Sequence, residues 1–317
     1  NNGEIQMQEL TLTRGFQSSV APELHFGLGQ NSTIDKLKVI WTDGKVQELT
    51  NVSGNQKLRL KYSDAVIPTN SDNQTNNTTL FKTVLESSQI FPSFKHEENI
   101  FDDFETQVLL PHKMSNFGPA LAVGDLNNDG LEDYFVGGAS GFEGQLFYQT
   151  AKGTFEKQNQ NFFAEDKVSE DLGALIIDVD NDGDNDLYIV SGGYEFLTDK
   201  RAQSLQDRLY LNDGKGNFTK ANNVLPVMIT SGSRAYSADF NKDGKPDILT
   251  LGRQVPGNYP SPANSYVLIN ESTKDNVKFS INSADVFKDL GMATSAIITD
   301  IDNDTWPDII IVGEWMP

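Results

Sequence analysis

Residues 178–186 read Asp-Val-Asp-Asn-Asp-Gly-Asp-Asn-Asp, and the apolar run 187–190 follows directly. Carboxylates at positions 1, 3, 5 and 9 of such a loop can converge on one hard cation, with the backbone carbonyl of position 7 as a further oxygen ligand. Gly183, at position 6, permits the sharp turn that this convergence needs. The stretch therefore predicts a calcium-binding loop.

The same pattern recurs three times, as DLNNDGLED from Asp125, DFNKDGKPD from Asp239 and DIDNDTWPD from Asp300. The starts are 53, 61 and 61 residues apart (178 − 125, 239 − 178, 300 − 239), so the loop belongs to a repeat. The sequence predicts up to four calcium ions. The candidate metal ligands are Asp125, Asn127, Asp129, Leu131 and Asp133; Asp178, Asp180, Asp182, Asp184 and Asp186; Asp239, Asn241, Asp243, Lys245 and Asp247; and Asp300, Asp302, Asp304, Trp306 and Asp308, with Leu131, Asp184, Lys245 and Trp306 acting through their backbone carbonyls.

The four loops are not equivalent. Asn127 and Asn241 each replace one carboxylate by a neutral side chain that still offers an oxygen. In the last loop Thr305 occupies the position where glycine normally takes a positive φ, which strains a β-branched residue. We therefore expect the site at Asp300 to be the weakest or the most distorted of the four.

An EF-hand would begin in the same way, but it requires a bidentate glutamate at position 12 and flanking helices. Position 12 is instead Val136, Ile189, Thr250 or Ile311. Each of these residues lies in a β-branched run that is typical of a strand. The aspartate at position 9 is thus expected to close each site.

Composition narrows the class of protein. The formal charge of −20 opposes binding to nucleic acid or to an anionic membrane surface, and no apolar run approaches the ~18 residues of a membrane-spanning helix. The chain has no cysteine, whereas calcium loops of moderate affinity fill where calcium is plentiful, which favours an extracellular location. The start at Asn1 is expected to be a processed or internal boundary.

The first part of the chain predicts a small all-β domain over residues 1–62. Apolar and polar residues alternate over 5–12, 37–41 and 58–62, and Asp43-Gly44 indicates a two-residue hairpin turn. An Asn-, Thr- and Ser-rich stretch, 63–79, predicts a linker. The sequences GFQSS, LHFGLG and VIWTDGKVQEL with NQKLRLKY resemble the ASPIC/UnbV domain, here shortened at its N-terminal end.

From residue 115 each unit consists of an apolar strand, an acidic loop, a second apolar strand and a hairpin. Such units predict four-stranded propeller blades that are stable only when stacked on neighbours. Residues such as FGPALAVGDLNNDGLEDYFVGG resemble the FG-GAP/VCBS repeats of integrin-like propellers. The expected fold is thus all-β, with residues 80–317 forming blades of a propeller that is incomplete at the C-terminus.

The segment 91–110 contains one histidine and four acids, His96, Glu97, Glu98, Asp102 and Asp103, but no spacing that matches a known metal motif. We expect it to form a first blade without a loop, which caps the repeat.

The leading functional prediction is a calcium-stabilised, non-enzymatic binding scaffold. The family resemblance implies a Bacteroidetes-type surface protein, a lipoprotein or secreted protein with protein partners such as an outer-membrane nutrient transporter or export complex. A polysaccharide-active enzyme with unrecognised Asp or Glu pairs, and a lectin-like glycan binder using Asn258-Tyr259-Pro260, remain alternatives.

Overall fold

The computed structural model describes residues 5–11, 20–67, 90–158, 161–195, 199–274, 276–282 and 285–316, and it divides into two compact units, 1–82 and 83–317. Residues 12–19, which include GFQSS, and residues 68–89, which include most of the expected linker, lie outside this description. In the described segments, no helix is both long and apolar enough to cross a membrane.

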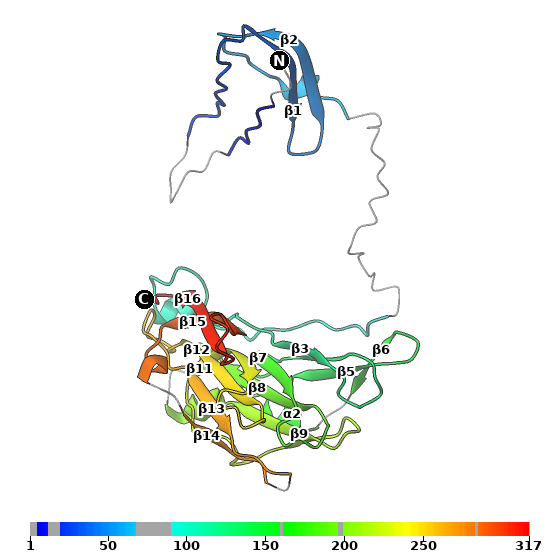
Figure 1. Ribbon diagram of the computed structural model, residues 1–317, viewed down its shortest axis with the longest axis vertical. Helices are drawn as coiled ribbons and strands as arrows, with labels where there is room; N and C mark the ends of the chain where they lie inside the picture. The colour runs from blue at the N-terminus through cyan, green and yellow to red at the C-terminus, as the bar shows by residue number, and fades with distance from the viewer. Residues whose placement is uncertain are drawn as a thin grey trace. The chain divides into compact units, whose positions relative to one another are not determined.

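The first unit is built on one antiparallel hairpin, β1 (Thr33–Ile40) and β2 (Val46–Ser53), in which Ile40 pairs with Val46 (Figure 1). Gly44 takes a φ of 84° and donates its N–H to the Trp41 carbonyl at 2.8 Å. Trp41 also donates its N–H to the Lys45 carbonyl at 2.9 Å, so the loop between the paired residues is 42–44 and the predicted two-residue turn is wrong. The described alternating segments 5–11 and 58–62 form no strands.

This unit extends past the predicted boundary at residue 62. The short helix η1 (Tyr62–Asp64) places the Tyr62 ring edge-on to Trp41, with 5.4 Å between centroids, and its hydroxyl donates to Asp43. Val66 then pairs with Val46. Residues 63–66 consequently belong to the small β unit, because their contacts are with its hairpin.

The second unit consists of antiparallel sheets in which neighbouring strands are also consecutive in the chain (Figure 1). The first blade is β3 (Leu121–Gly124), β4 (Asp133–Val136), β5 (Gln145–Gln149) and β6 (Phe155–Gln158); the second is β7 (Glu170–Ile177), β8 (Asp186–Gly192), β9 (Arg208–Asn212) and β10 (Phe218–Lys220); the third is β11 (Ser231–Ala238), β12 (Asp247–Gln254), β13 (Tyr266–Asn270) and β14 (Phe279–Ile281); the fourth contains β15 (Met292–Thr299) and β16 (Asp308–Glu314). Short helices among the described residues of this unit are α1 (Asp103–Thr106), α2 (Asn161–Asp166), η3 (Asp199–Leu205) and η4 (Asp285–Phe287). The all-β fold and the four-stranded blades are confirmed.

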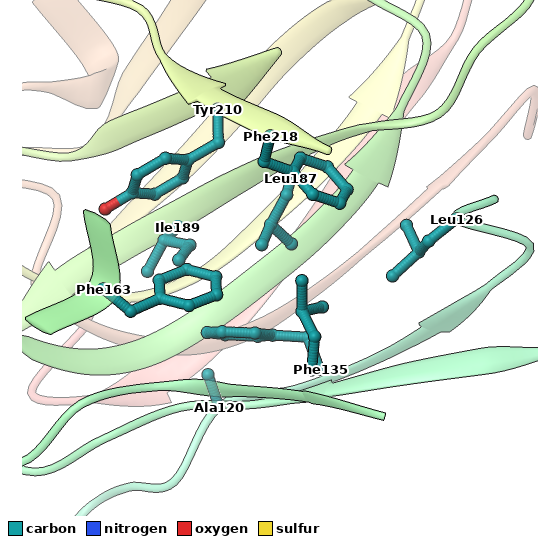
Figure 2. Packing of buried hydrophobic residues seen from close by; sticks show 9 residues of the cluster. Ala120, Leu126, Phe135, Phe163, Leu187, Ile189, Tyr210 and Phe218 are labelled. Atoms are coloured by element: carbon teal, nitrogen blue, oxygen red, sulfur yellow. The ribbon is translucent and has the colours of Figure 1, made fainter. Parts of the chain in front are cut away.

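Neighbouring blades bury the sheet faces that lie between them. Along β8, Leu187 and Ile189 belong to the core between the first and second blades, whereas Tyr188 and Val190 belong to the core between the second and third. Figure 2 shows Phe135 of the first blade facing Leu187 and Ile189 of the second. Because successive side chains of a strand point to opposite faces, a continuous apolar run fits a strand that is covered on both sides.

The segment 90–117 does not form the expected first blade. Its described residues contain no strand and one short helix, α1. Instead, Phe91 stacks on Phe155 with 4.9 Å between ring centroids, and Phe94 packs edge-on against Phe147. Segment 90–117 is therefore a covering strap over the first blade, held by aromatic contacts.

Candidate metal centre

Each acidic loop connects the first and second strands of a blade. The loops at Asp125, Asp178, Asp239 and Asp300 join β3 to β4, β7 to β8, β11 to β12 and β15 to β16. The buried strand pairs fix where each loop begins and ends, since the first and last aspartates adjoin paired residues such as Ile177 and Asp186. The four predicted sites thus occupy equivalent places in successive blades.

The carboxylate at position 1 organises the turn. Asp178 accepts hydrogen bonds from the N–H groups of Asp182 at 3.3 Å and Gly183 at 3.0 Å. The same two contacts occur from Asp125 to Asp129 and Gly130, from Asp239 to Asp243 and Gly244, and from Asp300 to Asp304 and Thr305. At position 3, the side-chain oxygens of Asn127, Asn241 and Asp302 accept the N–H of position 5.

The carboxylate at position 9 joins the loop to the sheet. Asp186 accepts the N–H of Val179 at 3.0 Å through one oxygen and the N–H of Asn212, in β9, at 2.9 Å through the other. Asp133 and Asp247 make the equivalent pairs of contacts, with Leu126 and Gln149 and with Phe240 and Asn270. Burial raises the pKa of Asp186 to about 7 and also raises the pKa of Asp133 and of Asp247.

Two loops bring three carboxylates together. One ligand oxygen from each of Asp178, Asp180 and Asp186 lies within 4.8 Å of the others, and Asp300, Asp302 and Asp304 form a second such group. Asp180 Oδ1 is buried and has no hydrogen-bond donor among the described residues. An oxygen without a donor, facing other carboxylates, is what a hard cation would satisfy, so these residues fit calcium.

The grouping differs between these two loops. Position 9 is a member of the group in the second loop, whereas in the fourth loop the group consists of positions 1, 3 and 5. Outside these two groups, the other side-chain ligands remain predictions. They are the carboxylates of Asp182 and Asp308 and the side chains of the two loops that contain Asn127 and Asn241. The backbone carbonyls of Leu131, Asp184, Lys245 and Trp306 are predicted ligands in the same sense.

Position 6 is left-handed in every loop. The φ values are 83° at Gly130, 96° at Gly183, 85° at Gly244 and 75° at Thr305. Thr305 thus adopts the conformation that favours glycine, and the fourth loop keeps the same turn at the cost of backbone strain. The Thr305 hydroxyl accepts a hydrogen bond from Lys242 of the preceding loop at 2.7 Å, and Lys242 Nζ lies 3.9 Å from the centre of the Trp306 ring.

Two asparagines that the sequence analysis did not select connect neighbouring sites. Asn212 donates to the carbonyls of Leu126 in the first loop and Asn185 in its own loop, at 2.8 and 2.9 Å. Asn270 donates in the same way to Val179 and Pro246. A weak signal was available, because both asparagines follow an apolar strand and precede an acid.

The geometry defines a repeat protein of stacked four-stranded blades, each with an acidic loop between its first two strands. Residues 1–67 match the family described as ASPIC and UnbV, and residues 125–189 and 178–250 match the FG-GAP-like repeat. Each repeat match begins at position 1 of one loop and ends at position 12 of the next. No curated protein matches the chain.

The chain therefore carries a match to the ASPIC and UnbV domain followed by matches to FG-GAP-like repeats, an order that indicates an integrin-like β-propeller. The predicted domain architecture is confirmed. Repeats of this family are often calcium-binding and are typically found in extracellular domains.

The backbone strain at position 6 predicts that two substitutions affect the free energy of unfolding differently. Replacing Gly183 by Thr should lower the free energy of unfolding by about 1–2 kcal/mol, although a Cβ at this position would meet nothing within 4 Å. Replacing Thr305 by Gly should raise it or leave it within about 0.5 kcal/mol, because relief of strain is partly offset by the flexibility of glycine in the unfolded chain. Urea denaturation in saturating calcium measures both. Equal losses in the two variants would show that backbone strain at position 6 is not the determinant.

The hydrogen bonds that Asn270 makes between blades predict a large loss of stability in Asn270→Ala. Asn270 is fully buried, and its removal leaves the carbonyls of Val179 and Pro246 without their donor. We expect a loss of about 2–3 kcal/mol in the free energy of unfolding. The exposed Asn222→Ala is the control and should change it by less than about 0.5 kcal/mol. A loss in Asn270→Ala no larger than in the control would contradict the role of the asparagine.

Proposed function

We propose that the chain is a calcium-stabilised, non-enzymatic extracellular scaffold that binds other macromolecules. The observation that carries the proposal is the convergence of Asp178, Asp180 and Asp186 around the donorless Asp180 Oδ1, at the edge of a fully buried strand. Two like charges at ~4 Å repel by about 4 kcal/mol at an effective dielectric of 20. A bound cation would turn this repulsion into attraction, so the loops are expected to be structural.

The loop carboxylates would stabilise each blade, and partners would bind at other surfaces of the blade. The loops are short, and their carboxylates accept backbone N–H groups of the same turn, which holds these carboxylates in place as cation ligands rather than as groups for substrate chemistry. Net charge of −20 favours partners with basic surfaces over nucleic acid. Within the proposal, those partners are proteins of a bacterial outer surface, such as a transporter or export complex to which this chain is an accessory, tethered as a lipoprotein.

A second candidate function is glycan binding beside Tyr259. A cavity of about 260 Å³ is lined by the stretch from Gln107 to Leu110 and by Tyr259. The Gln107 side chain fixes this loop, because it donates to the Tyr259 carbonyl and accepts the Tyr259 N–H. Tyr259 lines the cavity, and the exposed Trp315 donates its indole N–H to the Tyr259 hydroxyl at 2.9 Å, with 6.4 Å between the two ring centroids. Aromatic rings beside fixed amides are a platform on which a sugar can stack.

Metal removal tests the leading proposal. With a dissociation constant near 10 μM and millimolar calcium, each occupied site contributes about 2.7 kcal/mol. Excess EGTA should therefore lower the melting temperature strongly, and restored calcium should return it. Asp178→Asn should lose one site's share of the calcium-dependent shift, whereas Asp289→Asn, an exposed acid outside the loops, should keep the whole shift. A melting temperature that is the same in EGTA and in calcium would refute calcium stabilisation.

A glycan array tests the second candidate. If the cavity binds sugar, labelled wild-type protein should bind a subset of glycans without turning them over, and Tyr259→Ala should reduce that binding at least tenfold. Tyr236→Ala is the matched control, because Tyr236 lies on β11 between the third and fourth blades. Retained binding by Tyr259→Ala would exclude this cavity, and release of reducing ends from a polysaccharide panel would favour the enzymatic alternative.

A further inference from the structure

Glu170 lies at the end of the second blade that is opposite to the calcium loop. It is the first residue of β7 and pairs with Gly192, the last residue of β8. Eight residues separate it from Asp178, so at about 3.3 Å per residue the two carboxylates are roughly 25 Å apart along the strand. Any role of Glu170 is therefore independent of the acidic loops.

The Glu170 carboxylate is buried without a partner. The residue is 1 % exposed, and neither carboxylate oxygen has a hydrogen-bond donor among the described residues. Burial, followed by the nearby charges of Glu195 and Glu98, raises its pKa to about 10. A buried carboxyl group in a folded protein normally has donors or a counter-charge, so this group indicates a missing cationic partner.

Glu195 and Glu98 each also have a buried carboxylate oxygen without a hydrogen-bond donor among the described residues. Glu195 is 6 % exposed; one of its oxygens accepts the Tyr194 N–H, and the other, Oε1, is buried with no donor in the described part of the chain. Glu98, on the covering strap, pairs with His96 through Oε1 at 2.7 Å, while its Oε2 is buried and equally without a donor. The donorless atoms of these three residues are carboxylate oxygens, which either a proton shared between Glu170 and Glu195 or a bound cation would satisfy.

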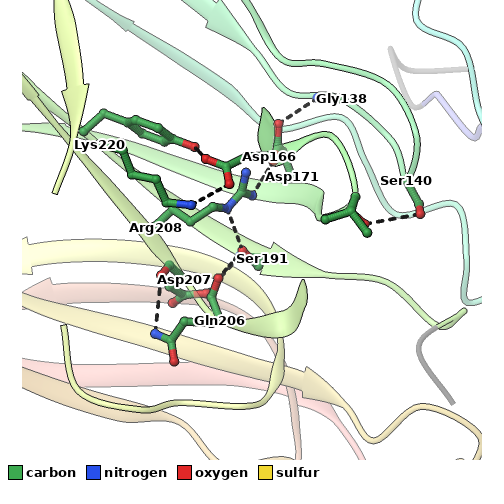
Figure 3. Close-up of polar contacts among 11 residues, drawn as sticks. Gly138, Ser140, Asp166, Asp171, Ser191, Gln206, Asp207, Arg208 and Lys220 are labelled. Carbon is green, nitrogen blue, oxygen red and sulfur yellow. Dashed lines mark hydrogen bonds and ion pairs between the residues drawn. The ribbon is translucent and has the colours of Figure 1, made fainter. Parts of the chain in front are cut away.

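Arg208, a buried cation of the same blade, pairs with other groups and not with Glu170. Arg208 donates to Asp171 and to the Ser191 hydroxyl, as Figure 3 shows. Asp171 follows Glu170 directly and accepts the Gly138 N–H through its other oxygen, which connects the first and second blades. Because alternate residues of a strand point to opposite faces, the pair Asp171–Arg208 and the Glu170 carboxyl belong to different faces of β7.

We propose that Glu98, Glu170 and Glu195 form a further cation site, which binds a hard divalent metal ion between the covering strap and the start of β7. The ligands are oxygens alone, as calcium and magnesium prefer. Among the described residues, the groups of three that converge within 4.8 Å lie in the acidic loops, so the oxygens of these three glutamates are further apart and would share the ion with water. Metal binding would displace the proton held on Glu170 and tie the strap to the second blade.

Counting bound ions tests this site separately from the loops. Native mass spectrometry of the whole chain in calcium, and in magnesium, should show one ion fewer in Glu170→Gln and in Glu195→Gln than in the wild type. Glu156→Gln, an exposed glutamate on β6, should retain every ion. Asp178→Asn should lose a different ion, so that the double variant with Glu170→Gln loses two.

The position of the ion completes the test. Anomalous diffraction from wild-type crystals soaked in Tb³⁺, a calcium substitute, should show a peak between Glu170 and Glu195 in addition to peaks at the loops. The melting temperature of Glu170→Gln in EGTA should equal or exceed that of the wild type, which separates lost binding from lost folding. An unchanged ion count in folded Glu170→Gln, or terbium peaks confined to the loops, would overturn the proposal. Should both glutamine variants fail to fold, the terbium map of the wild type decides.

Discussion

The structure of the repeat depends on the buried carboxylate at position 9 of the first three loops. Asp186 accepts one N–H from its own loop and one from β9, so the cation site and the third strand of the blade share a single side chain. A buried carboxylate of this kind is stable only while its acceptors are used. The sheet and the loop consequently cannot separate without leaving a charge unsatisfied in the interior.

This local connection extends across the repeat because the second and third blades are covered on both faces. The residues of β8 and β12 are buried along their whole length, and their alternate side chains enter different cores. Asn212 and Asn270 add hydrogen bonds from one blade to the loop of the preceding blade. A change at one loop therefore reaches its neighbour through backbone carbonyls and packed side chains, as in other linear repeats where stability is a sum of neighbour interactions.

The features that the sequence predicted are those set by residues close together in the chain. The spacing of the acids within a loop, the residue at position 6 and the strand-like run after each loop all lie within about fifteen residues, and the structure places them as expected. Thr305 shows the strength of that local code, because it keeps the turn despite an unfavourable φ. The covering strap was predicted wrongly, since its aromatic residues take their structure from β4, β5 and β6 and not from their own periodicity.

The candidate cation sites also differ in whether their ligands lie close together in the sequence. The loop carboxylates lie within nine residues of sequence and accept backbone N–H groups from their own turn. Their pattern alone therefore indicates a metal site. Glu98, Glu170 and Glu195 are brought together by the stacking of the strap and the second blade, and no motif marks them. They are recognised only from buried carboxylate oxygens that have no donor in the described part of the chain, a property of the folded chain. The density of acids in a sequence therefore locates only those sites whose ligands one turn can supply; sites assembled between elements have to be recognised from unsatisfied atoms.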